Sequence, residues 1–201
     1  MALHFSKKEF ESRKLATLNS MKKQNLDALL MFRQESMFWL TGYDTFGYVF
    51  FQTLILDQKG NIILLTRAPD LRQAQNTSNI EDIRIWVDKD QSNPTDDLKI
   101  ILNELNLKGK KVGIEYEAYG MTGRNALKIN KSLDGYCDVE DQSELITKHR
   151  VVKSAEEMVY VKKAAELADK ALDEAWKYTK AGASEAKILA EMQRVVLENG
   201  G

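Results

Sequence analysis

SMFWLTGYDTFGYVFFQTLILDQKGNIILLTR, residues 36–67, combines two strand-like runs with a compact cluster of glycine, tyrosine and aspartate. Residues 48–57 and 62–66 are rich in aromatic and β-branched side chains, which favours two strands. The QKGN segment between these runs has the composition of a turn, so the strands are predicted to pair as an antiparallel hairpin. This hairpin is expected to form the centre of a larger sheet.

The segment that precedes the hairpin has a helix followed by a buried strand. Ser6 and Glu9 stand at the spacing of a capping box, and Phe5 can pack on Phe10, which predicts a helix from Ser6 to about residue 23. Residues 26–32, LDALLMF, form a nearly continuous apolar run, as expected of a strand that is buried on both faces. A helix followed by a buried strand indicates an α/β fold.

The segment after the hairpin continues the alternation of helices and strands up to about residue 150. Helices are expected at about residues 68–75, 95–105 and 122–133, and strands at 83–87, 111–117 and about 136–140. The sequence therefore predicts an α/β fold with three layers, because helices must cover both faces of the sheet. The sheet should have about six strands and be mixed, because the hairpin requires one antiparallel pair.

Residues 151–201 have a different pattern. Ser154 and Glu157 form a capping box, and apolar residues at helical spacing predict a helix to about Lys180. Gly182 breaks this helix, and Ser184 can cap a second one. Two domains are therefore predicted, residues 1–150 and 151–201, and the two amphipathic helices of the second need another surface to cover their apolar faces.

Composition narrows the class of protein. The 29 basic and 30 acidic residues leave a net charge of −1, which does not fit a nucleic-acid-binding surface. No apolar stretch has the length of about 20 residues that a membrane-spanning helix requires, so no membrane partner is expected. The single cysteine, Cys137, excludes an intramolecular disulfide and fits a reducing compartment, so a cytoplasmic protein is expected.

The sequence contains no motif that specifies a catalytic or metal site. Its two histidines, His4 and His149, lie in unrelated settings, and there is no HExxH motif. Gly42 and Gly47 have the glycine spacing of a phosphate-binding loop, but Tyr48 follows where that loop has lysine. No catalytic residue and no metal ligand is therefore predicted, and a nucleotide-binding domain has no specific support.

The aromatic residues of the first predicted strand of the hairpin suggest a surface for a ligand or a partner. Strand alternation would place Tyr48 and Phe50 on one face and Val49 and Phe51 on the other. Core packing is the alternative for any of these side chains, and we assign to it the following residues: Val49, Phe51, Ile55 and Leu64. Arg67, at the end of the second strand, can meet a ligand's carboxylate or pair with Asp70 or Asp44; both readings stay open.

The chain resembles a known family in its motifs and in their order. FWLTGYDTFGYVFFQ, residues 38–52, resembles the N-terminal domains of the creatinase and Xaa-Pro peptidase (prolidase) family. Residues 148–175 and 181–196 are similar to the linker and first two helices of that family's pita-bread catalytic domain. Within the family, TGYDTFGYVFFQ followed by LTRAPDLRQAQ looks most like ectoine hydrolase, with Xaa-Pro dipeptidase and creatinase as alternatives.

The resemblance implies a metal-dependent C–N hydrolase. The family binds two metal ions through two Asp, one His and two Glu, and none of these ligands has a matching position in this sequence. We therefore expect no cofactor in this chain, which ends before the metal-binding core, and no activity from the chain alone. A pair of divalent metals, for example manganese, zinc or cobalt, is expected only in a full-length parent protein.

The resemblance also implies a homodimer whose N-terminal domain completes the neighbouring subunit's substrate site. The side chains expected to bind substrate there are Phe46, Tyr48, Phe50 and Arg67. The substrate would be a small amide, amidine or dipeptide, and Phe50 stands where creatinase has a basic residue, which argues against creatine. The alternative is a stand-alone, non-catalytic module that binds a ligand or dimerises through the same aromatic surface.

Overall fold

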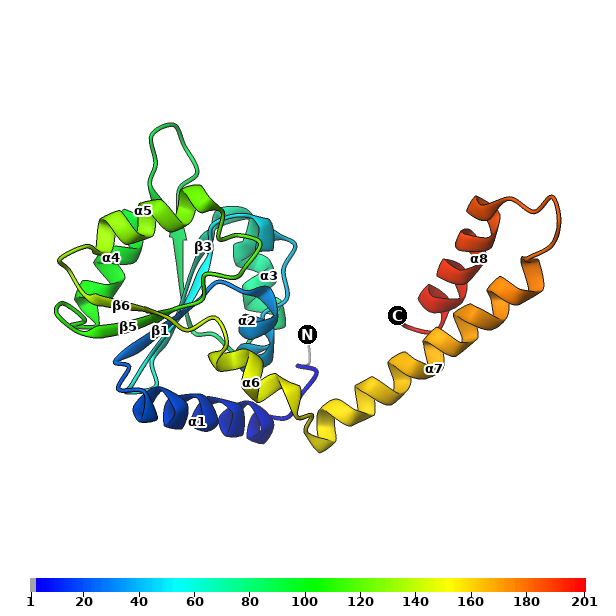
Figure 1. Cartoon of the computed structure of the whole chain (residues 1–201), viewed down its shortest axis with the longest axis horizontal. Coiled ribbons are helices and arrows are strands. Elements are labelled where there is room, and N and C mark those ends of the chain that lie inside the picture. Colours follow the sequence, from blue (N-terminus) through cyan, green and yellow to red (C-terminus); the bar gives the residue numbers. More distant parts are fainter. Residues whose placement is uncertain (1–2) are drawn as a thin grey trace. The chain divides into compact units, whose positions relative to one another are not determined.

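The computed structural model describes residues 3–201 and contains a six-stranded mixed sheet in the order β4-β3-β2-β1-β5-β6 (Figure 1). The strands are β1 (Ala28–Met31), β2 (Thr53–Asp57), β3 (Ile62–Arg67), β4 (Asp82–Trp86), β5 (Lys111–Ile114) and β6 (Asp138–Asp141). Only β2 runs antiparallel to its neighbours, so the other five strands all point in one direction. The predicted α/β fold with a mixed sheet is confirmed.

The predicted hairpin is formed by β2 and β3. Leu54 pairs with Leu64 in an antiparallel register. The carboxylate of Asp57 accepts hydrogen bonds from the backbone N–H groups of Lys59 and Asn61, at 3.0 and 2.8 Å, and so stabilises the turn between the strands. A short acidic side chain that bonds to the backbone two residues ahead is typical of such turns.

Helices cover both faces of the sheet. The first domain contains α1 (Lys7–Lys23), α2 (Gln34–Thr41), α3 (Leu71–Thr77), α4 (Pro94–Glu104), α5 (Gly123–Leu133) and α6 (Leu145–Val151), with short 3₁₀ turns η1 (Gly47–Val49) and η2 (Ala68–Asp70). Helices α4 and α5 pack on one face, whereas α1, α2, α3 and α6 contribute buried residues to the other. Helices α2 and α6 were not predicted from the sequence.

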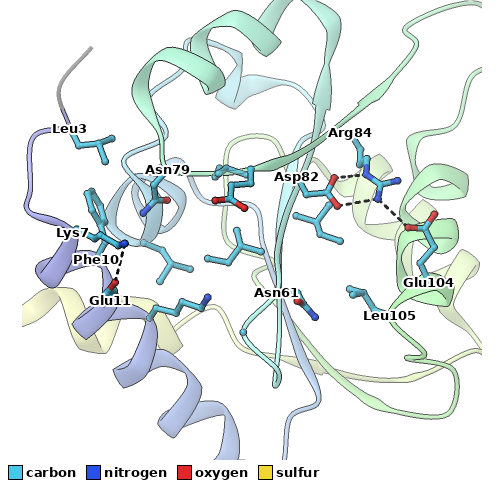
Figure 2. A pocket seen from close by; sticks show the side chains of 17 residues that line it. Leu3, Lys7, Phe10, Glu11, Asn61, Asn79, Asp82, Arg84, Glu104 and Leu105 are labelled. Carbon is cyan, nitrogen blue, oxygen red and sulfur yellow. Dashed lines mark hydrogen bonds and ion pairs between the residues drawn. The ribbon is translucent and has the colours of Figure 1, made fainter.

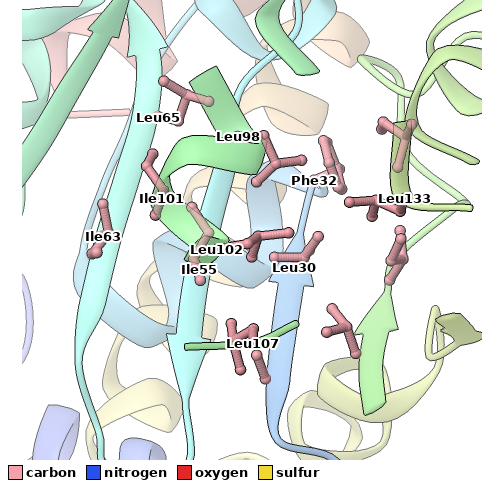
Figure 3. Packing of buried hydrophobic residues seen from close by; sticks show 14 of the residues in the cluster. Leu30, Phe32, Ile55, Ile63, Leu65, Leu98, Ile101, Leu102, Leu107 and Leu133 are labelled. Atoms are coloured by element: carbon pink, nitrogen blue, oxygen red, sulfur yellow. The ribbon is translucent and has the colours of Figure 1, made fainter. Parts of the chain in front are cut away.

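Alternation along the strands divides the apolar residues between two cores. Leu30 of β1 and Ile55 of β2 face the core under α4 and α5, which Figure 3 shows with Leu98, Ile101 and Leu133. Their neighbours in sequence, such as Leu29 and Leu54, face the core on the other side. A sheet with buried residues on both faces and helices outside each is the predicted three-layer arrangement.

Helix α1 begins where its capping residues predicted. The side-chain oxygen of Ser6 accepts a hydrogen bond from the backbone N–H of Glu9, and the rings of Phe5 and Phe10 meet edge to face at 6.0 Å. Arg13 is buried, and its guanidinium donates to the carbonyl oxygen of Trp39 at 2.8 Å. This bond joins α1 to α2.

The strand predicted over residues 48–57 is shorter in the structure, since β2 begins at Thr53. The residues before it form η1 and an extended connection, so the strand alternation expected of Tyr48 to Gln52 was wrong. Val49, which we assigned to the core, is 49 % exposed. Phe51, Ile55 and Leu64 are buried as predicted.

The described chain divides into two compact units, with the boundary between Val152 and Lys153. The second unit contains α7 (Ala155–Tyr178) and α8 (Glu185–Glu198), which pack against each other. The capping box of α7 is formed as predicted: Ser154 N donates to the Glu157 carboxylate at 2.8 Å, and Glu157 N donates to Ser154 Oγ at 3.1 Å. Most large apolar side chains of this unit, such as Trp176 and Leu197, are exposed.

Candidate functional site

The carboxyl ends of β1, β3, β4, β5 and β6 lie at one edge of the sheet, together with the beginning of β2. In open α/β sheets, ligands bind at this carboxyl edge, where the loops that follow the strands meet. Residues 42–52 connect α2 to β2 at this edge, and we call them the aromatic loop. The loop contains three of the four residues that the sequence predicted as substrate contacts.

The aromatic loop is held at both ends. Gly42 ends α2 in the left-handed region, with φ of 81°, and its N–H donates to the carbonyl oxygen of Phe38 at 2.7 Å. The N–H of Asp44 donates to Thr77 Oγ1 at 3.1 Å, which connects the loop to α3. At the other end, the indole N–H of Trp86 donates to the carbonyl oxygen of Phe51 at 3.0 Å. These contacts fix the loop between α3 and β4.

The buried carboxylate of Asp70 contacts the middle of the aromatic loop. The hydroxyl of Thr45 donates to Asp70 Oδ1 at 3.0 Å and accepts from the N–H of Gly47 at 2.8 Å. A side chain at Gly47 would begin 2.4 Å from the same Asp70 oxygen, so only glycine fits there without movement. The buried carboxylate of Asp70 therefore sets the position of η1.

Arg67 joins this cluster from the end of β3. Its Nη2 atom lies 3.4 Å from Asp70 Oδ2, and its Nη1 atom lies 4.0 Å from Asp88 Oδ2. The guanidinium stacks on the ring of Phe50, 3.5 Å from the ring centroid. Of the two sequence readings of Arg67, the structure shows the pairing with Asp70.

A buried polar network lies under the same loop. The hydroxyl of Tyr43 donates to Gln52 Oε1 at 2.9 Å, and the hydroxyl of Thr66 approaches the same oxygen at 3.3 Å. Burial raises the pKa of the Tyr43 phenol, so this side chain acts as a neutral hydrogen-bond donor at neutral pH. The network fixes the loop to the sheet and does not face solvent.

The four predicted contact residues have different surroundings in the structure. Phe50 and Arg67 are stacked together. Tyr48 instead meets Tyr119, which follows β5, with ring centroids 5.7 Å apart. Phe46 is 86 % exposed and Phe50 is 46 % exposed, so both present ring surface to solvent. The role of the four residues in substrate binding stays a prediction.

Sequence reasoning missed a buried carboxylate at this edge. Glu115, directly after β5, accepts hydrogen bonds from the N–H groups of Phe32 and Arg33, at 3.1 and 3.0 Å, and from Ser36 Oγ at 2.6 Å. Burial raises its pKa to about 7, although these donors act in the opposite direction. Glu115 thus occupies the start of α2, a position where α/β proteins often bind an anion. The charged residue directly after the VGI run was the only signal in the sequence.

The described residues contain no metal site. Within residues 3–201, no group of three or more His, Cys, Asp and Glu side chains could hold a metal ion. His149 packs parallel to the ring of Trp39, and its Nε2 atom lies 2.9 Å from Ser20 Oγ. Burial raises the pKa of the Cys137 thiol to about 11, which makes it a poor nucleophile at neutral pH. The donor set of the described residues therefore does not fit a pair of divalent metals.

Comparison with known families identifies the first domain. Residues 13–152 match the family described as the creatinase/prolidase N-terminal domain. This chain belongs to that family. The match confirms the family to which residues 38–52 pointed, and it includes the aromatic loop, Arg67 and Asp70.

Two curated relatives of this creatinase/prolidase-type chain are about twice its length. An uncharacterised hydrolase/peptidase from Sinorhizobium fredii is 26% identical over 195 residues, which are 94% of this chain and 50% of the relative. The ectoine hydrolase of Halomonas elongata is 23% identical over an alignment of 205 positions, which covers 98% of this chain and 51% of that enzyme. The chain thus spans about half the length of the curated relatives it matches.

Solved structures of creatinase/prolidase-type proteins share the fold. The prolidase from Thermococcus sibiricus aligns with a TM-score of 0.79 at 21% identity, over 96% of this chain and 50% of that one. An Xaa-Pro aminopeptidase structure from Streptococcus pyogenes aligns with a TM-score of 0.57 at 18% identity, over 71% of this chain and 98% of the other.

Among residues 3–201, no helix is both long and apolar enough to cross a membrane.

Proposed function

We propose that this chain is the N-terminal part of a metal-dependent C–N hydrolase similar to ectoine hydrolase or Xaa-Pro dipeptidase. The observation that carries the proposal is the family match over residues 13–152, together with hydrolase relatives that are about twice as long as the chain. In this proposal, residues 1–150 are the N-terminal domain, and residues 151–201 are the linker and first helices of a pita-bread catalytic domain. The protein would work in the cytoplasm, where its single thiol, Cys137, stays reduced.

We infer that the metal ions are bound by the other half of the parent protein. The parent's pair of divalent ions, for example manganese, zinc or cobalt, would activate a water molecule for attack on an amide, amidine or peptide carbon. The first domain would contribute dimer contacts and part of the substrate site. Its exposed aromatic rings rest on buried hydrogen-bonded supports, which is the arrangement that a preorganised binding surface requires.

The substrate contacts in this proposal are Phe46, Tyr48, Phe50 and Arg67. In a homodimer, these side chains would contact the substrate that is bound in the neighbouring subunit. Phe46 and Phe50 are exposed, and the guanidinium of Arg67 stacks on the ring of Phe50. The rings would pack on the apolar part of a small substrate and exclude water from it. The role needs a metal-binding catalytic domain, which in this proposal is the other half of the parent protein.

The proposal is tested first on the 201-residue chain and on its gene. The chain alone should not hydrolyse ectoine or Xaa-Pro dipeptides when manganese, zinc or cobalt is added, and turnover would contradict the proposal. A reading frame downstream of Gly201 that encodes two Asp, one His and two Glu as metal ligands would support it. A stop codon directly after Gly201 would favour a stand-alone, non-catalytic module instead.

The homodimer is tested separately in solution. Sedimentation equilibrium of the full-length protein should give twice the subunit mass at micromolar concentration. A monomer at all concentrations would remove the proposed role of the aromatic loop in a neighbouring subunit.

A further inference from the structure

A groove of about 770 Å³ lies at the opposite edge of the sheet from the aromatic loop, beside the amino ends of β3 and β4. We call it the amino-edge groove. Figure 2 shows Lys7, Phe10 and Glu11 of α1 on one side, and Arg84, Glu104 and Leu105 on the other. The volume lies in the range of small-molecule sites and is large for a single amino acid.

The inner wall of the amino-edge groove is apolar. Phe10, Leu40, Ile63 and Ile80 line it, and all four side chains are otherwise buried in the domain. These residues come from α1, α2, β3 and the segment before β4, so the wall belongs to the packed core and is fixed in position. A ligand with apolar side chains would remove part of this wall from water, which favours binding.

Most charges around the groove already have partners. Lys7 and Glu11 form an ion pair at 3.9 Å on α1. On the other side, the guanidinium of Arg84 pairs with Asp82 and, at 3.2 Å, with Glu104. The Lys7–Glu11 pair is balanced, whereas the two carboxylates that share Arg84 leave one negative charge in excess, and each of these five side chains has an ion-pair partner.

Lys14 and Glu81 are the exceptions. Both line the groove, and neither side chain forms an ion pair or hydrogen bond with another residue in the described range, 3–201. The ammonium group of Lys14 lies against the hairpin turn, where a side chain at Gly60 would begin 3.3 Å from Nζ. Lys14 comes from α1 and Glu81 from the segment before β4, so one groove presents one unpaired charge of each sign.

We propose that the amino-edge groove binds a short peptide with free termini. The peptide's carboxylate would pair with Lys14, its ammonium group with Glu81, and its apolar side chains would rest on Ile63 and Ile80. Two opposite unpaired charges beside an apolar wall match a zwitterion with an apolar middle. The groove needs no metal and lies away from the aromatic loop, so this site is independent of the proposed hydrolase function.

The test is a titration of the 201-residue chain with the dipeptide Leu-Leu, followed by amide NMR. N-acetyl-Leu-Leu lacks the ammonium group, Leu-Leu amide lacks the carboxylate, and free leucine is the control for ligand size. The protein variants are Lys14→Gln and Glu81→Gln. Lys8→Gln on α1 and Asp90→Asn after β4 are matched controls, because both residues are exposed and lie outside the groove.

Leu-Leu should shift the amide signals of Gly60, Ile80 and Glu81, and each groove variant should weaken its binding roughly three- to tenfold, as for a lost charge-assisted contact. Lys14→Gln should not change the affinity for Leu-Leu amide, and Glu81→Gln should not change the affinity for N-acetyl-Leu-Leu. Equal affinity in groove and control variants would overturn the proposal, as would the absence of shifts at the groove. Free leucine that binds as tightly as Leu-Leu would exclude a peptide as the ligand.

Discussion

The guanidinium carbon of Arg67 lies 3.5 Å from the centroid of the Phe50 ring, and this stack joins the end of β3 to the aromatic loop. The Nη2 atom of the same guanidinium lies 3.4 Å from Asp70 Oδ2. A planar guanidinium can stack on an aromatic ring while its N–H groups bind a carboxylate, which lysine cannot do in the same geometry. Arg67 therefore connects the exposed ring to the buried supports of the loop.

The first prediction concerns the energy of this stack. In a double-mutant cycle with Arg67→Met and Phe50→Leu, the two changes should couple by about 0.5–1 kcal/mol of unfolding free energy, as for a partly exposed cation–π pair. Urea unfolding of the four proteins measures the coupling. Arg67→Met combined with Leu127→Ala, an exposed residue of α5, is the control pair and should be additive. Coupling no larger than in the control pair would contradict the proposed connection.

The second prediction concerns the contact of Gly47 with Asp70. An added methyl group at Gly47 would begin 2.4 Å from Asp70 Oδ1, and the carboxylate cannot move without loss of its bond from Thr45. Gly47→Ala should therefore lower the unfolding free energy by about 1–3 kcal/mol, the usual cost of overpacking. Gly123→Ala is the matched control, because nothing lies within 4 Å of a side chain added there. Equal stability of the two variants would show that the loop adapts freely.

Local sequence signals predicted much of the first domain because their causes are local. The cap at Ser6, the apolar run of β1 and the turn at Asp57 each involve residues within a few positions of one another. Helix α2 is different. Its first turn is stabilised by Glu115, whose carboxylate accepts from Ser36 across 79 positions of sequence. A bond between such distant residues leaves no pattern that a local reading can detect.

The conformation of the aromatic loop could not be predicted from local sequence patterns either. Its aromatic and β-branched residues have high strand propensity, but the loop forms the 3₁₀ turn η1 instead. Two close contacts fix this conformation: Gly47 packs against the carboxylate of Asp70, and Gly120 packs against the backbone of Phe50. Tertiary contacts override propensity in this way, because propensities differ by about 1 kcal/mol at most. The family resemblance suggested four site residues but not their contacts. In the structure, Phe50 stacks on Arg67 and the ring of Tyr48 contacts that of Tyr119.

The third prediction concerns pH and Glu115. The raised pKa, from 4.5 to about 7, means that the folded protein binds this proton more tightly than the unfolded chain. The stabilisation from Glu115 should thus be complete below pH 4.5 and be lost as the pH rises through 7. The shift corresponds to a loss of about 3 kcal/mol between these two states, as an order of magnitude. Urea unfolding at several pH values measures it.

The measurement should follow Trp39 and Trp86 in a Trp176→Phe background, so that only the first unit reports by fluorescence. The Glu115→Gln variant should lose most of the decrease in stability between pH 5 and pH 7. Glu11→Gln, an exposed residue of α1, is the control and should keep the pH dependence of the parent chain. The same pH dependence in Glu115→Gln would show that another group titrates.

The last prediction tests the proposed role of the aromatic loop in a full-length parent enzyme. Phe50→Ala should lower kcat/KM about tenfold, because a ring that packs on the substrate is lost from the site. Leu15→Ala, an exposed residue of α1, should leave activity unchanged. An unchanged kcat/KM for folded Phe50→Ala would exclude Phe50 from the substrate site.

Hybrid dimers decide which subunit uses Phe50. One subunit carries Phe50→Ala with intact metal ligands, and the other carries Phe50 with a disabled metal ligand. If Phe50 reaches into the neighbouring subunit, the intact metal site receives a phenylalanine from its partner, and this site should regain the kcat/KM of the parent enzyme. If Phe50 acts in its own subunit, the hybrid should be no better than the Phe50→Ala homodimer. Recovery in the hybrid would therefore place the aromatic loop of one subunit in the other's site, because no other arrangement returns the missing ring to a working metal centre.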